Sequence, residues 1–152
     1  MQAELEDRGT GIRMHVFVTH LDHRSERSRL RSARMLRDAA ASVAGPAIVV
    51  GDFNTDAGSE THRLLLADSV LGDTLTLARR RPQPDWGSFS QYRAPRIGTP
   101  RLDWILVSPS TVVEVAGVNP ARFDGVAASD HEPVQAVVRI NASGDQPAAS
   151  AG

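Results

Sequence analysis

The chain has 152 residues, enough for one domain with a buried core, and its formal net charge is −1. This balance gives no general electrostatic reason to bind nucleic acid or an anionic membrane, and the lack of cysteine excludes disulfides, thiolate catalysis and Cys-ligated zinc. No apolar run reaches the roughly 18 residues of a membrane span and the N-terminus lacks signal-peptide features, so we expect a cytoplasmic chain as given.

The first elements are predicted to form a β-hairpin. Residues 2–6 and 12–19 flank a segment with two glycines and an aspartate, Asp7 to Gly11, which suits a tight reversal. The second of these strands alternates apolar and other residues and has His20 at its carboxyl end.

An amphipathic helix is predicted from Ser25 to Ala44. Ser25 and Glu26 suit a helix start, and apolar residues recur at spacings of three and four: Leu30, Ala33, Leu36, Ala40 and Val43. Gly45-Pro46 ends the helix. The flanking strands and this helix make a βαβ unit, which would be right-handed if its strands pair in parallel.

The strand Ala47 to Val50 is entirely apolar, which is typical of a strand covered on both faces. Its carboxyl end carries Asp52 and Asn54. The carboxylate can take a hard cation or a proton, and the amide can donate to a phosphate oxygen. Alternatively, both side chains bond only their own backbone, as in many loops between a strand and a helix.

The remainder is predicted as short elements. A helix is expected over residues 60–67, residues 71–77 are ambiguous, and the loop 79–87 carries a basic run that either contacts a substrate or lies exposed at the surface. Strands are expected over 88–92, 102–108, 112–118 and 134–140. We expect one domain over residues 1–141 and a disordered tail over 142–152.

Four polar clusters stand at predicted strand ends: Thr19-His20, Gly51-Asp52-Phe53-Asn54, Arg101-Leu102-Asp103 and Ser129-Asp130-His131. Because these four clusters occur in this order and each is attached to an apolar strand, the chain resembles the endonuclease/exonuclease/phosphatase family of metal-dependent phosphoesterases. The resemblance runs from about Arg13 to Ile140. It implies an α/β (α+β) fold that is part of a four-layer αββα sandwich, and hydrolysis of phosphate esters, nucleic acid among them, with Mg²⁺ or Mn²⁺.

The resemblance also implies roles for individual side chains. Asp52 would help hold the metal and orient or deprotonate the attacking water, and Asp130 would be a further metal ligand. Asn54 would hold a phosphate oxygen.

Two histidines complete the implied set. His131, oriented by Asp103, would act on the phosphate or as an acid or base, and His20 would stabilise developing negative charge. These residue types suit the reaction because phosphoryl transfer needs charge neutralisation and positioning, and because hard cations prefer oxygen ligands.

The chain departs from the family pattern before its first strand. Family members begin with a strand carrying an Asn, a helix, and a strand ending in a metal-binding Glu; neither Glu4 nor Glu6 matches that ligand. Without that portion we expect an open sheet edge, which a missing N-terminal segment or self-association would cover. The alternative function is therefore a non-catalytic remnant that binds a partner as a half-domain.

Two other kinds of site are disfavoured. Ser129, Asp130 and His131 are contiguous, so they do not form a Ser-His-Asp triad, because adjacent side chains on an extended segment point apart. A zinc site from His20 and His23 is disfavoured because that spacing works best on a helix.

Overall fold

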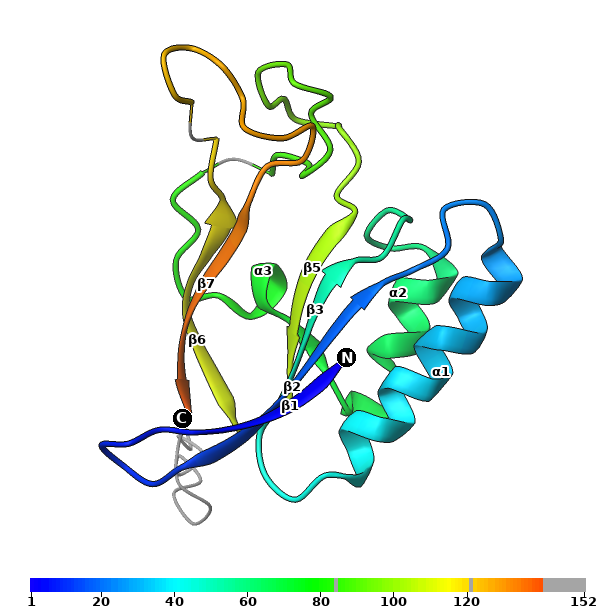
Figure 1. Ribbon diagram of the computed structural model, residues 1–152, viewed down its shortest axis with the longest axis vertical. Coiled ribbons are helices and arrows are strands. Elements are labelled where there is room, and N and C mark those ends of the chain that lie inside the picture. The colour runs from blue at the N-terminus through cyan, green and yellow to red at the C-terminus, as the bar shows by residue number, and fades with distance from the viewer. Residues whose placement is uncertain (84, 121, 141–152) are drawn as a thin grey trace, which may run out of the picture.

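The computed structural model describes residues 1–83, 85–120 and 122–140, in which two β-sheets lie face to face and helices cover the outer side of the larger one (Figure 1). The larger sheet has the strand order β1-β2-β3-β5-β4 and the smaller pairs β6 with β7. The strands are β1 (Gln2–Glu6), β2 (Arg13–His20), β3 (Ala47–Asp52), β4 (Gly72–Asp73), β5 (Asp103–Val107), β6 (Thr111–Val118) and β7 (Val134–Ile140). The helices are α1 (Glu26–Ser42), α2 (Glu60–Leu65) and α3 (Thr74–Leu77), with a 3-10 turn at Ala67–Ser69. The mixed fold class expected from the sequence is confirmed.

The β2-α1-β3 unit forms as predicted. Ser25 caps α1 by accepting a hydrogen bond from the Ser28 backbone N–H. Strands β2 and β3 pair in parallel, with His20 opposite Asp52 at their carboxyl ends. The connection therefore brings two predicted functional side chains to one edge of the sheet.

Gly51 allows β2 and β3 to approach closely just before that edge. Its φ is +148°, and a Cβ at this position would lie 1.9 Å from the Thr19 carbonyl oxygen. No other residue fits without moving the backbone. On the other side of β3, strand β5 runs antiparallel, and Asp103 pairs with Asp52.

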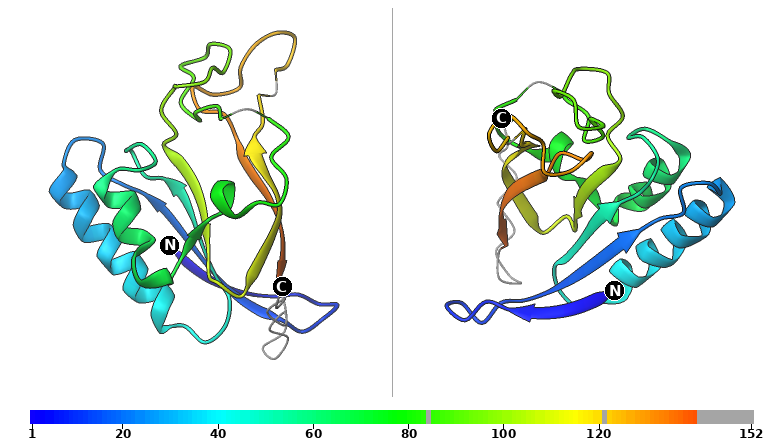
Figure 2. Two further views of the ribbon diagram at one scale, coloured as in Figure 1. Left: turned by 180° about the vertical axis from the view of Figure 1, so that it is seen from behind. Right: turned by 45° about the horizontal axis from the view of Figure 1, so that its top comes forward.

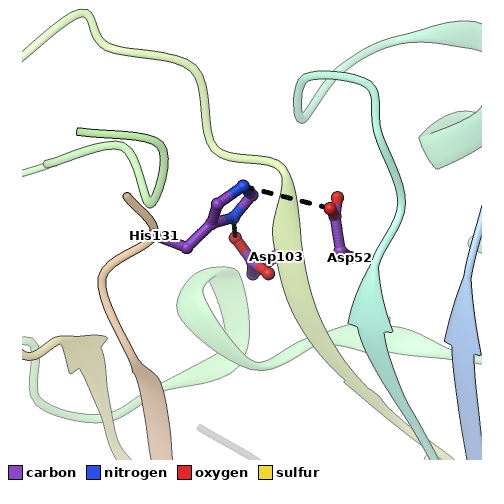
Figure 3. A group of neighbouring side chains, drawn as sticks. All are labelled: Asp52, Asp103 and His131. Carbon is purple, nitrogen blue, oxygen red and sulfur yellow. Dashed lines mark hydrogen bonds and ion pairs between the residues drawn. The ribbon is translucent and has the colours of Figure 1, made fainter. Parts of the chain in front are cut away.

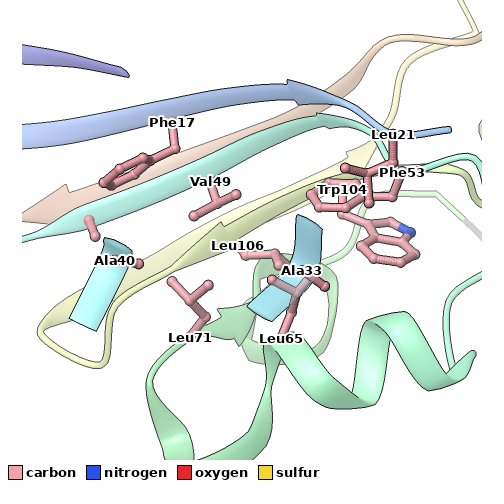
Figure 4. Packing of buried hydrophobic residues seen from close by; sticks show 11 residues of the cluster. Phe17, Leu21, Ala33, Ala40, Val49, Phe53, Leu65, Leu71, Trp104 and Leu106 are labelled. Carbon is pink, nitrogen blue, oxygen red and sulfur yellow. The ribbon is translucent and has the colours of Figure 1, made fainter. Parts of the chain in front are cut away.

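The main core lies between the larger sheet and helices α1 and α2 (Figure 4). Phe17, Val49 and Leu106 point from the sheet toward the helices, where Ala33 and Leu65 are buried. Trp104 stacks on Phe53 with ring centroids 4.2 Å apart. This packing fixes the residues directly beside the carboxyl end of β3.

The opposite face of the larger sheet is covered only in part. Beneath β5 it packs on the smaller sheet through a second cluster that includes Val107, Val113 and Ala116. Over β1 and β2, however, Leu5 is 49% exposed and Val18 is 39% exposed, and the β1–β2 hairpin projects away from the other layers (Figure 2). Among the described residues β7 pairs with β6 alone, so its second edge is open.

The segment 88–92 does not form the strand predicted from the sequence. It makes only an isolated bridge between Phe89 and His131. The backbone N–H groups of Ser90 and Gln91 both donate to the Asp130 carbonyl, and Gln91 and Tyr92 have positive φ. These bonds turn the chain and prevent a regular ladder.

Residues 71–77, ambiguous in sequence, form β4 and then α3, whose N-cap Asp73 accepts a hydrogen bond from the Leu75 backbone N–H. The predicted tail 142–152 lies outside the described residues.

Candidate active site

Three side chains from separate segments converge at the carboxyl end of β3 (Figure 3). Asp52 ends β3, Asp103 begins β5, and His131 lies shortly before β7. One ligand atom from each lies within 4.8 Å of the others. The structure thus brings together two carboxylates and an imidazole that are far apart along the chain.

His131 and Asp103 form a hydrogen-bonded pair. His131 Nδ1 lies 2.7 Å from Asp103 Oδ2, and Nε2 lies 4.0 Å from Asp52 Oδ2. Burial lowers the pKa of His131, but the hydrogen bond and charge of Asp103, followed by the charges of Asp52 and Asp130, outweigh burial and raise it. When Nδ1 donates to Asp103, the reactive Nε2 faces Asp52.

Asp52 is held from its own loop and faces both imidazoles. Its Oδ1 accepts a hydrogen bond from the Asn54 backbone N–H at 2.8 Å, and its Oδ2 lies 3.4 Å from Nε2 of the exposed His20. The backbone hydrogen bond, one of the two alternatives from the sequence, is present in this residue and leaves Oδ2 facing the two imidazoles; its functional role stays a prediction.

Asn54 joins the loops that follow β2 and β3. It has a φ of 50°, and its Nδ2 donates to the Leu21 carbonyl at 2.8 Å. An amide nitrogen carries two hydrogens, so this bond uses one of its two donors. The bond also fixes the position of the loop that carries His20.

Asp130, like His20 and Asn54, is a predicted site residue outside the three-residue group. Its carboxylate accepts a hydrogen bond from Ser129 Oγ at 3.4 Å, and its backbone carbonyl accepts from Ser90 and Gln91. It lies close enough to His131 to contribute to the raised pKa of that ring. Its role as a metal ligand stays a prediction.

A buried ionic cluster next to the start of β5 was not predicted from the sequence. The Asp73 side chain is fully buried, and its Oδ2 lies 2.8 Å from His62 Nε2 and 2.5 Å from Arg101 Nη2. Burial raises the pKa of Asp73, but the bonds to His62 and Arg101 outweigh it and the pKa is lowered. The Arg101 carbonyl in turn accepts from Trp104 Nε1 at 2.7 Å, so the cluster fixes the start of β5.

The basic run in the loop 79–87 is largely paired within the chain. Arg79 bonds Glu114, and Arg81 bonds Asp85 at 2.9 Å. Arg80 makes backbone bonds to β6. These contacts favour the interpretation of the run as part of the protein surface.

The converging donor set suits a hard divalent cation. Asp52 and Asp103 offer carboxylate oxygens, each side chain is partly exposed, and ions such as Mg²⁺ keep several waters while binding one or two protein carboxylates. Since Asp103 is already bonded to His131, Asp52 is the carboxylate that both the sequence motif and the geometry make available to a cation.

The chain is also similar to known proteins. A sequence model of the endonuclease/exonuclease/phosphatase family matches residues 4–131. No curated protein matches the chain.

Several solved structures share the fold. A Bacteroides thetaiotaomicron endonuclease/exonuclease/phosphatase family protein is 25% identical with a TM-score of 0.84, and the match covers 93% of this chain and 55% of that one. A Bacteroides vulgatus endonuclease/exonuclease/phosphatase is 27% identical, with a TM-score of 0.82 and coverage of 92% and 54%. The mannosyl-6-phosphatase of B. thetaiotaomicron is 26% identical, with a TM-score of 0.78 and coverage of 91% and 56%.

The chain therefore spans little more than half the length of these solved structures. None of the described helices is long and apolar enough to cross a membrane.

Proposed function

The chain belongs to the endonuclease/exonuclease/phosphatase family, and on that premise we propose that it carries the catalytic side chains of a divalent-metal-dependent phosphoester hydrolase. The observation that carries the proposal is the convergence of Asp52, Asp103 and His131 within 4.8 Å at one sheet edge. A cation-binding carboxylate beside a carboxylate-oriented imidazole is the combination that phosphoryl transfer requires.

In the proposed reaction, a water oxygen forms a bond to phosphorus while the bond from phosphorus to the leaving oxygen breaks. Asp52 orients the water and takes its proton, and the leaving oxygen takes up a proton from solvent. His131, whose pKa is raised by Asp103, carries a proton on both ring nitrogens in this step: Nδ1–H donates to Asp103 and Nε2–H donates to a phosphate oxygen, while the Asn54 amide donates to a second phosphate oxygen.

Mg²⁺ or Mn²⁺ would be held by Asp52, with Asp130 as the further ligand predicted from the sequence, and would neutralise charge that develops on the phosphate. His20, 3.4 Å from Asp52, stands on the exposed side of the group, where its imidazole stabilises the same charge.

The proposed substrate class is a phosphate ester. The likeness to a mannosyl-6-phosphatase favours assays on phosphomonoesters, and nucleic acid is a second substrate to test. The net charge of −1 gives no added support for tight duplex binding.

We further propose that turnover needs a further segment of polypeptide in addition to these 152 residues. Two observations support this requirement: the match covers only 54–56% of the solved relatives, and the sheet face over β1 and β2 is apolar and partly uncovered. A segment that adds strands to the open edge of β7 would cover that face.

The test compares two forms of the protein. The chain alone, and a version extended to the length of the solved relatives, are assayed with Mg²⁺ or Mn²⁺ on p-nitrophenyl phosphate, bis(p-nitrophenyl) phosphate and a single-stranded oligonucleotide. We expect metal-dependent hydrolysis of at least one substrate by the extended form, abolished by Asp52→Asn. Stable complexes without hydrolysis in either form would instead support the partner-binding alternative.

A further inference from the structure

The catalytic pair Asp103–His131 joins two segments that different sheets hold. Asp103 begins β5 in the larger sheet, whereas His131 precedes β7 in the smaller one. Among the described residues, no backbone hydrogen bond connects residues 101–103 directly with residues 130–132. The short distance between the two side chains therefore depends on a third segment that bonds to both of these segments.

The segment 88–91 provides that link. On one side, the Phe89 backbone N–H donates to the Pro100 carbonyl. On the other, Ser90 and Gln91 donate to the Asp130 carbonyl at 3.0 and 2.9 Å. The Phe89 ring also lies 4.9 Å from the His131 ring.

Ser88 is the residue of this segment that bonds both sides. Its Oγ accepts hydrogen bonds from the consecutive backbone N–H groups of Leu102 and Asp103, at 2.9 and 3.0 Å. Its carbonyl accepts from the Glu132 backbone N–H at 2.6 Å. Ser88 has no exposed surface, so no water replaces these bonds when the hydroxyl is removed.

The surroundings of Ser88 hold it in this position. A Cβ on the preceding Gly87 would lie 2.0 Å from the Thr99 carbonyl oxygen, so only glycine lets the two segments approach this closely. On the other side, Glu132 is buried and bonded to Arg122 at 2.6 Å. The hydroxyl is therefore set between two fixed backbones.

We propose that Ser88 is a positioning residue for the Asp103–His131 pair: its hydroxyl fixes the start of β5, its carbonyl fixes the segment of His131, and together they keep His131 in the Nδ1–H tautomer. The 2.7 Å hydrogen bond between His131 Nδ1 and Asp103 Oδ2 tolerates little displacement of either residue. Without the hydroxyl, the backbone N–H groups of Leu102 and Asp103 lose their acceptor and the start of β5 moves relative to His131. The proposed function gives this geometry its catalytic purpose.

The test reads the tautomer of His131 directly. Long-range ¹H–¹⁵N correlation spectra of the full ¹⁵N-labelled chain, without metal or substrate and at a pH where the ring is neutral, distinguish Nδ1–H from Nε2–H. We expect the Nδ1–H form alone in the parent protein, a shift toward Nε2–H in Ser88→Ala, and return to Nδ1–H in Ser88→Thr. If Ser88→Ala does not fold, Ser88→Cys replaces it in the same measurement of the His131 tautomer. Cysteine has a similar volume but accepts hydrogen bonds only weakly.

Ser108→Ala is the matched control. Ser108 Oγ also accepts a backbone N–H, that of Ala47 at 3.0 Å, but at the opposite end of β3 and β5. Its loss should lower stability without changing the His131 spectrum. An unchanged tautomer in a folded Ser88 variant would overturn the proposal and leave Ser88 a purely structural residue.

Because no substrate enters this experiment, its failure is distinct from failure of the proposed hydrolase. The assays in the preceding subsection test the reaction, whereas the spectra test only how the pair is held.

Discussion

Asp52 and Asp103 face each other as a residue pair in the antiparallel ladder between β3 and β5. The ladder places two carboxylates side by side where the strands leave the core, and the pair differs in its other contacts. Asp103 bonds His131 at 2.7 Å, whereas Asp52 faces His20 and His131 at 3.4 and 4.0 Å. Under the proposed function the two acids therefore have separable roles, and each role has its own test.

Asp103→Asn should lower kcat/KM of the extended enzyme by about 10²–10⁴-fold, the range associated with positioned acid–base residues. The amide can no longer accept from His131 Nδ1 as an anion, so the ring loses both its orientation and the raised pKa. Steady-state kinetics at saturating metal measures the effect. The surface variant Asp38→Asn on α1 should retain activity, and comparable losses in both would contradict the assignment.

Asp52→Asn should weaken Mn²⁺ binding by about tenfold or more, because one anionic ligand is lost from a site that uses few protein carboxylates. Isothermal titration of Mn²⁺ gives the dissociation constant without turnover. Asp68→Asn, which alters an acid exposed on the 3-10 turn, serves as the control. Equal affinity in Asp52→Asn and the parent protein would remove Asp52 from the metal site.

The Asp73 cluster predicts a specific acid dependence of stability. The pKa of Asp73 is lowered in the folded protein, so at low pH the unfolded chain takes up a proton before the folded one. The contribution of this group is therefore present above about pH 3.8, the ordinary value, and is lost as the pH falls through the folded pKa. Urea unfolding at pH 5, 4 and 3 should show the decline.

Asp73→Asn should cost about 3–5 kcal/mol at pH 7, because it leaves buried partners of the carboxylate unpaired. Its unfolding free energy should also fall less between pH 5 and pH 3 than that of the parent protein. The surface variant Asp38→Asn should keep the parental slope. A parental slope in Asp73→Asn would show that other carboxylates cause the decline.

Gly51→Ala should destabilise the fold by about 2–4 kcal/mol, since the added Cβ meets the Thr19 carbonyl and forces β2 and β3 apart. Gly58→Ala separates the clash from the backbone strain. Gly58 also has a positive φ, +85°, but nothing lies within 4 Å of its Cβ position, so we expect a cost of only about 1 kcal/mol. Thermal unfolding by circular dichroism compares the two, and equal costs would contradict the close approach.

The sequence allowed the β2-α1-β3 unit to be predicted because its signals are local. The apolar spacing within α1, the cap at Ser25 and the apolar run into Asp52 each require no knowledge of distant residues. The convergence of Asp52, Asp103 and His131 could be predicted because the polar clusters at the strand ends resemble, in their order along the chain, those of the endonuclease/exonuclease/phosphatase family.

What could not be predicted depends on contacts between distant segments. In the sequence, Asp73 resembles an ordinary acid in a turn. Only in the folded chain do α2 and the segment before β5 place His62 and Arg101 against its carboxylate. A short strand was predicted over residues 88–92, but the backbone N–H groups of Ser90 and Gln91 both donate to the Asp130 carbonyl and do not form a ladder with a neighbouring strand. In both cases the partner lies more than ten residues away, and local periodicity carries no information about it.

The packing of Trp104 gives the molecule a built-in optical reporter. Trp104 is 1% exposed and stacks on Phe53, and its ring lies edge-to-face with the His62 ring at a centroid distance of 4.6 Å. Trp86 is partly exposed. Emission from Trp104 should therefore be blue-shifted in the native protein and move to longer wavelength when the layer under α1 and α2 opens. Fluorescence then follows the layer that supports the strand ends with the proposed catalytic residues.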